Sequence, residues 1–134
     1  MNSLVLDCSF IMSSVMPDEQ RPFIEYSNFN IYVPTVFYLE CNNVLLSAIN
    51  KNRINIADYK QYIETLRSLP INVDKFSSMP ESMHFIAQLA LANKLTIYDA
   101  SYLELATRMS AKIATFDKQL QVAASKNNID LVNC

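Results

Sequence analysis

The segment SLVLDCS, residues 3–9, decides the fold: a short apolar run, Ser3 to Leu6, ends directly at Asp7. Such a run is typical of a buried strand that brings a side chain to the edge of a parallel sheet. Working outward, four further short apolar segments predict strands: 31–33, 71–73, 112–116 and, as a possible edge strand, 131–132.

Helical periodicity occupies the intervals between these strands. Helices are predicted over 35–50 with Thr35 as N-cap, 56–69, 81–93, 99–109 and 118–126, and over a stretch broken by Pro17 and Pro22 that runs toward Tyr26. Strands that alternate with helices of this length indicate an α/β sandwich with a mainly parallel sheet. No repeat, linker or low-complexity segment interrupts it, so a single domain over residues 1–134 is expected.

Composition excludes several classes of enzyme. Of the 134 residues, 51% are hydrophobic and 18% charged, which suits a compact core and not a disordered chain. Glycine is absent, so a P-loop, a Rossmann GxGxxG turn and a GxSxG nucleophile elbow are ruled out. The single histidine, His84, excludes a histidine pair for acid–base catalysis and a multi-histidine zinc site. Catalysis would therefore rest on carboxylates, hydroxyls, lysines or thiols.

Cysteine usage and targeting signals predict a cytoplasmic protein. Cys8, Cys41 and Cys134 form an odd set without CxxC spacing, which favours a reducing compartment. The apolar N-terminus lacks a basic region and contains Asp7, so a signal peptide is not expected. No apolar run reaches the roughly 18 residues of a membrane span.

Two aspartates stand at the predicted carboxyl ends of strands, where open α/β sheets bind ligands. Asp7 follows SLVL and Asp117 follows KIATF, and a bare carboxylate there is costly unless a cation, water or a helix N-terminus receives it. Asp99, after LTIY, opens a predicted helix. Each of the three is open to a second interpretation, as an ordinary helix N-cap.

Glu40 is placed differently, among apolar residues in the middle of a predicted, largely buried helix. With Asn43 and Ser47 it forms one narrow polar stripe, which is either a solvated face or part of a site. If the four carboxylates converge, they repel one another unless a divalent cation lies among them. Hard oxygen ligands suit Mg²⁺ or Mn²⁺, and such a site typically activates water against a phosphodiester. Glu104, five residues after Asp99, is expected to be solvated.

Four segments, LVLDCS, PTVFYLECNNVL, LTIYDASYLELA and IATFDKQLQVAA, resemble in this order the PIN-domain ribonucleases, specifically toxins of the VapC type, over Leu4 to about Ala124. The resemblance implies a three-layer PIN sandwich and Mg²⁺- or Mn²⁺-dependent endonucleolytic cleavage of RNA. It also implies a homodimer and a cognate antitoxin that covers the site. The matching acidic residues, which would bind the metal and carry catalysis, are Asp7, Glu40, Asp99 and Asp117.

Supporting positions match as well: Ser9 beside the first acid, Asn43 beside the second and Thr115 beside the fourth. The chain departs from the family at Ser110, where relatives often carry glycine, and at Gln119, where some have a further acid or Asn. We expect the first departure to affect only a turn, and the second makes a metal ligand at Gln119 doubtful.

Two alternatives remain on the residues alone. A non-catalytic module could keep the fold and bind RNA or protein in its groove, although four mutually repelling acids argue against it. Phosphotransfer on Asp7 is disfavoured because Ser9 stands where a dehalogenase-type site needs a second Asp. Basic residues are sparse; those that could touch phosphates, or form ordinary helix surface, are Arg21, Lys51, Arg53, Lys60 and Arg67.

Overall fold

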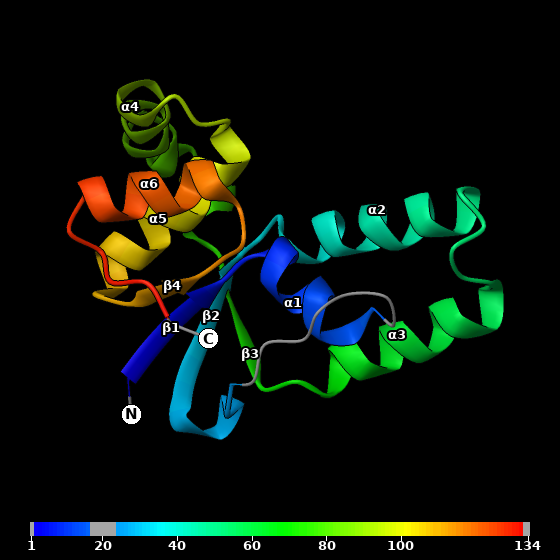
Figure 1. Ribbon diagram of the computed structural model, residues 1–134. Helices are drawn as coiled ribbons and strands as arrows, with labels where there is room; N and C mark the ends of the chain where they lie inside the picture. Colours follow the sequence, from blue (N-terminus) through cyan, green and yellow to red (C-terminus); the bar gives the residue numbers. More distant parts are fainter. Residues whose placement is uncertain (1, 17–23, 133–134) are drawn as a thin grey trace.

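The computed structural model describes residues 2–16 and 24–132 and arranges them around a four-stranded sheet (Figure 1). The strands are β1 (Asn2–Leu6), β2 (Phe29–Pro34), β3 (Ile71–Asp74) and β4 (Lys112–Ala114). Their order is β3-β2-β1-β4, and every pairing is parallel. The predicted parallel sheet is confirmed, and the carboxyl ends of all four strands lie at one edge.

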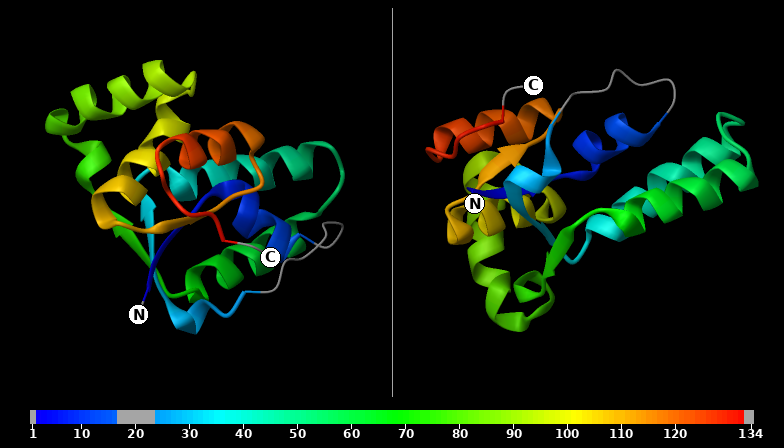
Figure 2. Two further views of the ribbon diagram at one scale, coloured as in Figure 1. Left: turned by 60° about the vertical axis from the view of Figure 1, so that its left-hand side comes forward. Right: turned by 90° about the horizontal axis from the view of Figure 1, so that it is seen from below.

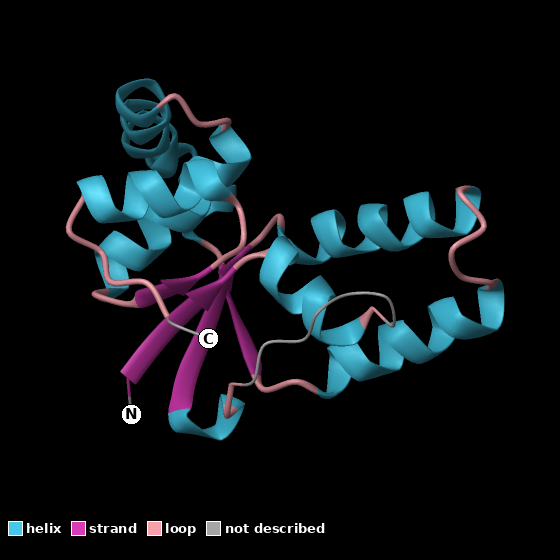
Figure 3. Cartoon of the chain, viewed as in Figure 1, coloured by secondary structure: helices cyan, strands magenta, loops and turns pink. Residues whose placement is uncertain are grey.

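Helices cover both faces of the sheet, as the three-layer prediction requires (Figure 3). On one face α5 (Ile97–Met109) packs on β1 and β2, and α4 (Met83–Asn93) and α6 (Lys118–Lys126) pack against α5. On the other face α1 (Cys8–Val15) contacts α2 (Phe37–Asn50), and α2 contacts α3 (Ile56–Ser68). Helices α2 and α3 form a hairpin that extends away from the sheet (Figures 1 and 2).

Strand β1 lies at the centre of the core. Leu4, Val5 and Leu6 have no exposed surface, because helices cover both faces and neighbouring strands both edges. This is why the strand is continuously apolar instead of alternating. No helix within the described part of the chain is long and apolar enough to cross a membrane.

Helix α1 corrects the prediction for the N-terminal region. The sequence pattern placed a helix around Pro17 and Pro22, but residues 17–23 lie outside the described residues, and residues 26–28 form a short 3-10 turn. The helix instead begins at Cys8, directly after β1, with the Asp7 side chain as its cap. Its eight residues include three serines and give little helical signal of their own.

The start of α2 also differs from the prediction. Thr35 is not its N-cap: Val36 holds that position without a side-chain hydrogen bond, and Thr35 Oγ1 lies 2.9 Å from Ser77 Oγ. Glu40 is therefore in the first turn, not in the middle of the helix. The helix is not largely buried either, since Leu39 and Leu46 are 73% and 53% exposed.

Smaller differences occur near the C-terminus. Helix α5 starts at Ile97 with Thr96 as N-cap, so Asp99 lies in its first turn and does not cap it. Strand β4 ends at Ala114, before Thr115. Leu131 makes an isolated parallel bridge to Ile113 in place of a strand over 131–132.

Two helices end in the left-handed conformation without glycine. Lys94 caps α4 with φ 55°, and Ser110 caps α5 with φ 51°. Glycine adopts this conformation most easily, so a serine or lysine with its Cβ is held there at a cost in conformational energy. The departure at Ser110 lies in this turn, at the C-cap of α5.

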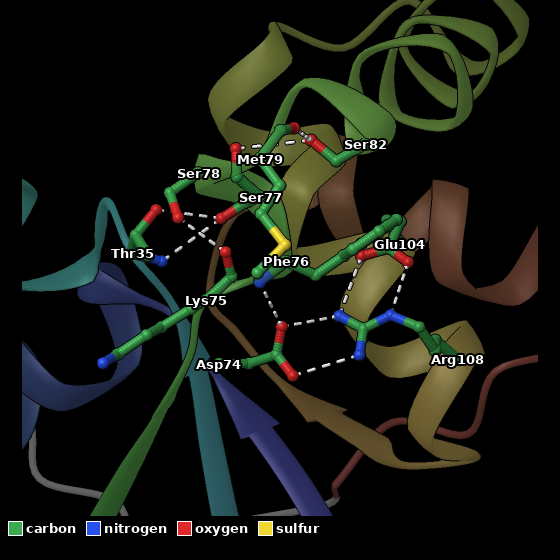
Figure 4. Close-up of polar contacts among 10 residues, drawn as sticks. All are labelled: Thr35, Asp74, Lys75, Phe76, Ser77, Ser78, Met79, Ser82, Glu104 and Arg108. Carbon is green, nitrogen blue, oxygen red and sulfur yellow. Dashed lines mark hydrogen bonds and ion pairs between the residues drawn. The ribbon is translucent and has the colours of Figure 1, made fainter.

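An ion-pair network joins the end of β3 to α5 (Figure 4). Arg108 donates to both carboxylate oxygens of Asp74, at 2.7 and 3.0 Å, and to Glu104 at 2.8 and 3.2 Å. Its guanidinium also lies over the Phe76 ring, 4.8 Å from the centroid. Glu104 is 7% exposed, so the prediction that it is solvated is wrong.

Candidate metal centre

The four predicted acids come from four elements that meet at the carboxyl edge of the sheet. Asp7 directly follows β1, and Asp117 follows the neighbouring strand β4 by three residues. Glu40 is in the first turn of α2, after β2, and Asp99 is in the first turn of α5. The parallel topology therefore brings together positions that span more than a hundred residues of sequence.

Asp7 is the most deeply buried of the four, at 6% exposure. Its Oδ1 accepts hydrogen bonds from the Ser9 hydroxyl at 2.7 Å and from the Phe10 backbone N–H at 3.0 Å, and its Oδ2 accepts one from Thr115. Burial raises the pKa of Asp7, these hydrogen bonds oppose the rise, and the nearby Asp117 charge adds to it. Hydrogen bonds therefore fix the orientation of the carboxylate, while its burial disfavours the charged form.

Ser9 and Thr115 connect the first and fourth acids. Their hydroxyl oxygens lie 3.3 Å apart, and each contacts Asp7. Thr115 Oγ1 also accepts the backbone N–H of Asp117 at 3.0 Å. The Asp117 side chain caps α6 by accepting the Leu120 N–H at 3.0 Å. Asp7 and Asp117 are thus both helix N-caps, as the second interpretation of these residues predicted. Both also lie at the carboxyl edge of the sheet.

Glu40 is held by a residue that the sequence did not single out. The Tyr102 hydroxyl, on α5, donates to Glu40 Oε1 at 2.5 Å, and Tyr102 is only 1% exposed. Burial raises the pKa of Glu40, the Tyr102 hydrogen bond lowers it, and the charges of Asp99 and Asp7 raise it again. A buried tyrosine on an apolar helix resembles ordinary core, so only its need for a polar partner could have signalled this contact.

Asp99 completes the arrangement. Its backbone N–H donates to Thr96 Oγ1 at 3.1 Å, while burial, and then the charge of Asp117, raise the pKa of its carboxyl group. Each of the four carboxylates is therefore close enough to influence at least one of the others. Among residues 2–16 and 24–132, no Lys, Arg or His forms an ion pair with any of them.

The other predicted positions are less closely involved. Asn43 is exposed, and within the described chain it makes none of the hydrogen bonds that hold the four carboxylates. Cys41 is buried, and a hydrogen bond with Cys8 is the main cause that raises the pKa of its thiol. Cys8 opens α1 and Cys41 lies on α2, so the two thiols come from helices that contact each other.

Whether the centre suits a divalent cation depends on donor chemistry and on spacing. All four donors are carboxylates, the hard oxygen ligands that Mg²⁺ and Mn²⁺ prefer. The mutual repulsion of these groups, and the raised pKa values of Asp7, Glu40 and Asp99, are what a bound cation would relieve. In the described residues, however, no three His, Cys, Asp or Glu side chains are arranged to hold an ion as they stand. The donor set fits a metal, and coordination would require the side chains to move closer together.

The basic residues of the predicted phosphate-contacting set lie on the α2–α3 hairpin. Lys51, Arg53, Lys60 and Arg67 are exposed, and Arg67 pairs with Glu64 at 3.0 Å. Arg21 lies outside the described residues. The four positive charges of this set that the structure describes therefore all lie on the α2–α3 hairpin.

Solved structures of other proteins share this architecture. The chain is similar to the crystal structure of PAE2754 from Pyrobaculum aerophilum, with a TM-score of 0.67 and 18% identity over 91% of this chain and 79% of that one. It is similar to the structure of FitAcB from Neisseria gonorrhoeae, with a TM-score of 0.63 and 16% identity over 97% and 96%. No curated protein matches it. The model of the PIN domain family matches residues 4–126, from the central strand to the end of α6, and the chain therefore belongs to the PIN domain family.

Proposed function

We propose that this chain is a Mg²⁺- or Mn²⁺-dependent endoribonuclease that cleaves phosphodiester bonds in RNA. The observation that carries the proposal is the set of four carboxylates at one sheet edge, whose charges disfavour one another and which no described basic side chain neutralises. Ionised groups kept in such an arrangement at a cost in stability are a mark of a functional site. Family membership agrees with a nuclease.

Each acid has a role in the proposal, and neighbouring side chains orient two of the four. Asp7, Glu40, Asp99 and Asp117 bind the cation, which when bound supplies activated water and charge stabilisation at the phosphate. Ser9 and Thr115 orient Asp7 by donating to its two oxygens. Tyr102 orients Glu40 through its Oε1. Asn43 makes no such contact with the residues that the structure describes, so its supporting role is an expectation from the family resemblance.

The biological setting rests on the resemblance to VapC-type toxins. In that setting the chain is a single-domain toxin of residues 1–134 that works in the cytoplasm, forms a homodimer and is covered by a cognate antitoxin. The exposed Lys51, Lys60 and Arg67 of the α2–α3 hairpin are candidates for contact with RNA phosphates.

The proposal is tested by incubating purified, antitoxin-free protein with total cellular RNA and Mn²⁺ and resolving the products on a sequencing gel. We expect discrete bands that disappear with EDTA and with Asp7→Asn. Asparagine keeps an oxygen for the helix cap, so the variant should fold. Asp130→Asn is the matched control, because Asp130 is exposed and lines a pocket with Asn2 and Lys112, at the amino ends of β1 and β4.

The alternative is a non-catalytic PIN-fold module that binds RNA or protein. The observation in its favour is that, in the described chain, no three acidic side chains are arranged to hold an ion as they stand. Folded protein that binds RNA but cuts none with Mg²⁺ or Mn²⁺ would support this alternative and contradict the nuclease. Cleavage by Asp7→Asn at the rate of the unmodified protein would also contradict the proposed mechanism.

A further inference from the structure

Phe116 lies between two residues of the carboxylate centre, Thr115 and Asp117, in the loop that joins β4 to α6. Its backbone N–H donates to Ser9 Oγ at 3.0 Å, and the Ser9 hydroxyl donates to Asp7 Oδ1 at 2.7 Å. Two consecutive hydrogen bonds therefore connect the backbone of Phe116 to the most buried acid. The position of this aromatic residue is tied to that of the centre.

The ring of Phe116 is also held in orientation. It stacks on Phe10 of α1, with the centroids 5.3 Å apart and the planes inclined by 18°. Phe10 is 1% exposed and belongs to the core, so it provides a rigid support for one face. Phe116 itself remains 46% exposed. The result is a flat apolar surface whose orientation is already fixed and which is open to solvent beside Asp117.

The surroundings of the ring favour one kind of occupant. Its neighbours along the chain are a hydroxyl and a carboxylate, and the Asp7 and Ser9 side chains lie behind its backbone. An apolar peptide side chain would cover these polar groups without satisfying them. An unpaired nucleobase offers a planar face for stacking while its own phosphate reaches the acidic centre. Bases inside a duplex are already stacked on their neighbours and expose no face.

We infer that Phe116 is a stacking platform for an unpaired base next to the phosphate at the carboxylate centre, an inference that rests on the proposed nuclease function. The platform gives the enzyme a preference for single-stranded or looped RNA. Stacking on an aromatic ring tolerates every base, so Phe116 contributes affinity and strand selection and does not read sequence. Because Phe10 already fixes the ring, little side-chain freedom is lost when a base binds.

The test measures RNA binding by protein in the Asp7→Asn background, which leaves the RNA uncut. The probes are a single strand of about 12 nucleotides carrying the fluorescent base 2-aminopurine, and the same strand annealed to its complement. We expect Phe116→Leu to weaken single-strand binding about 5- to 150-fold and to reduce the quenching of 2-aminopurine that stacking causes. Phe116→Tyr should retain both properties, and duplex binding should respond to neither change.

Leu91→Ala on α4 is the control, because Leu91 is 83% exposed and belongs to a different surface. Equal single-strand affinity with and without the Phe116→Leu substitution would overturn the platform while leaving the nuclease intact, provided that unmodified protein still cleaves RNA. Equal weakening on single strand and duplex would overturn it as well, because the ring would then act only through the shape of the site. If the unmodified protein neither binds nor cleaves RNA, both the platform and the proposed function fail.

Discussion

The ion pair between Asp74 and Arg108 predicts a measurable loss of stability in the variant Asp74→Asn. Arg108 makes two hydrogen bonds to Asp74, at 2.7 and 3.0 Å, and the Asp74 side chain is 20% exposed. Hydrogen bonds to charged groups of this kind contribute about 1.5–3 kcal/mol. Since the Arg108 side chain is 34% exposed, solvent screening reduces the expected loss to about 1–2 kcal/mol. Asparagine keeps the Oδ1 acceptor for the Phe76 N–H and for one hydrogen bond from Arg108, so the variant removes the charge together with the second hydrogen bond from Arg108.

The assay is thermal unfolding followed by circular dichroism at pH 7. A chain of 134 residues has an unfolding entropy of roughly 0.28 kcal/mol/K, so the loss corresponds to a fall in Tm of about 4–7 °C. Glu64→Gln is the matched control, because Glu64 pairs with Arg67 at 3.0 Å while both side chains are at least 70% exposed. It should lower Tm by less than about 2 °C. Equal shifts for the two variants would refute the reasoning.

The dependence on pH gives an independent check. The hydrogen bond from Arg108 is the main cause that lowers the pKa of Asp74 below its ordinary value of 3.8. A lowered pKa in the folded state means that stability is present above the unfolded value and is lost as the pH falls through the folded value. The difference in Tm between unmodified protein and Asp74→Asn should be constant from about pH 7 to pH 5 and shrink below about pH 4. A difference that grows on acidification would contradict the ion pair.

Two further predictions concern the metal centre and one helix end. In calorimetry, Glu40→Gln should weaken Mn²⁺ binding strongly. Tyr102→Phe should weaken it less, because this variant removes only the hydrogen bond to Glu40 Oε1. Glu81→Gln is the control, because Glu81 is exposed. An unmodified isotherm for Glu40→Gln would remove that residue from the centre. Ser110→Gly should raise the free energy of unfolding by about 0.5–1 kcal/mol in chemical unfolding, since Ser110 has φ 51°. A destabilised variant would show that contacts of the serine side chain outweigh the conformational cost of its left-handed backbone.

Much of the fold could be predicted from periodicity and strand ends. The run before Asp7 indicated a strand covered on both faces, and Leu4 to Leu6 are fully buried in the centre of a parallel sheet. Asp7 and Asp117 were also predicted to follow strands, and the structure adds that these strands, β1 and β4, are neighbours that end at the same edge. These inferences succeed where a local pattern is sufficient to define the geometry.

The remaining features depend on contacts between distant segments. Tyr102 reaches Glu40 across 62 residues of sequence, and nothing local distinguishes it from a core aromatic residue. Glu104 was expected to be solvated, but it is buried and pairs with Arg108 in a network whose third member, Asp74, comes from a strand. Helix α1 was missed because its serines carry little helical preference, while its cap and its packing on α2 stabilise it. Tertiary partners decide these positions, and a single sequence does not name them.

The pairing of β1 with β4 has a consequence for biosynthesis. Asp7 and Thr115 are 108 positions apart, so at about 5–20 residues per second the ribosome adds the second roughly 5–20 s after the first. Until β4 has emerged and docked on the nascent core, Asp7 has neither Thr115 nor Asp117 beside it. The centre is therefore assembled only after β4 and Asp117 have been synthesised, and a polypeptide released before residue 112 lacks a complete set of acids. On the proposed function, a growing chain of this topology cleaves no RNA near the ribosome until β4 and the loop that carries Thr115 and Asp117 have been added.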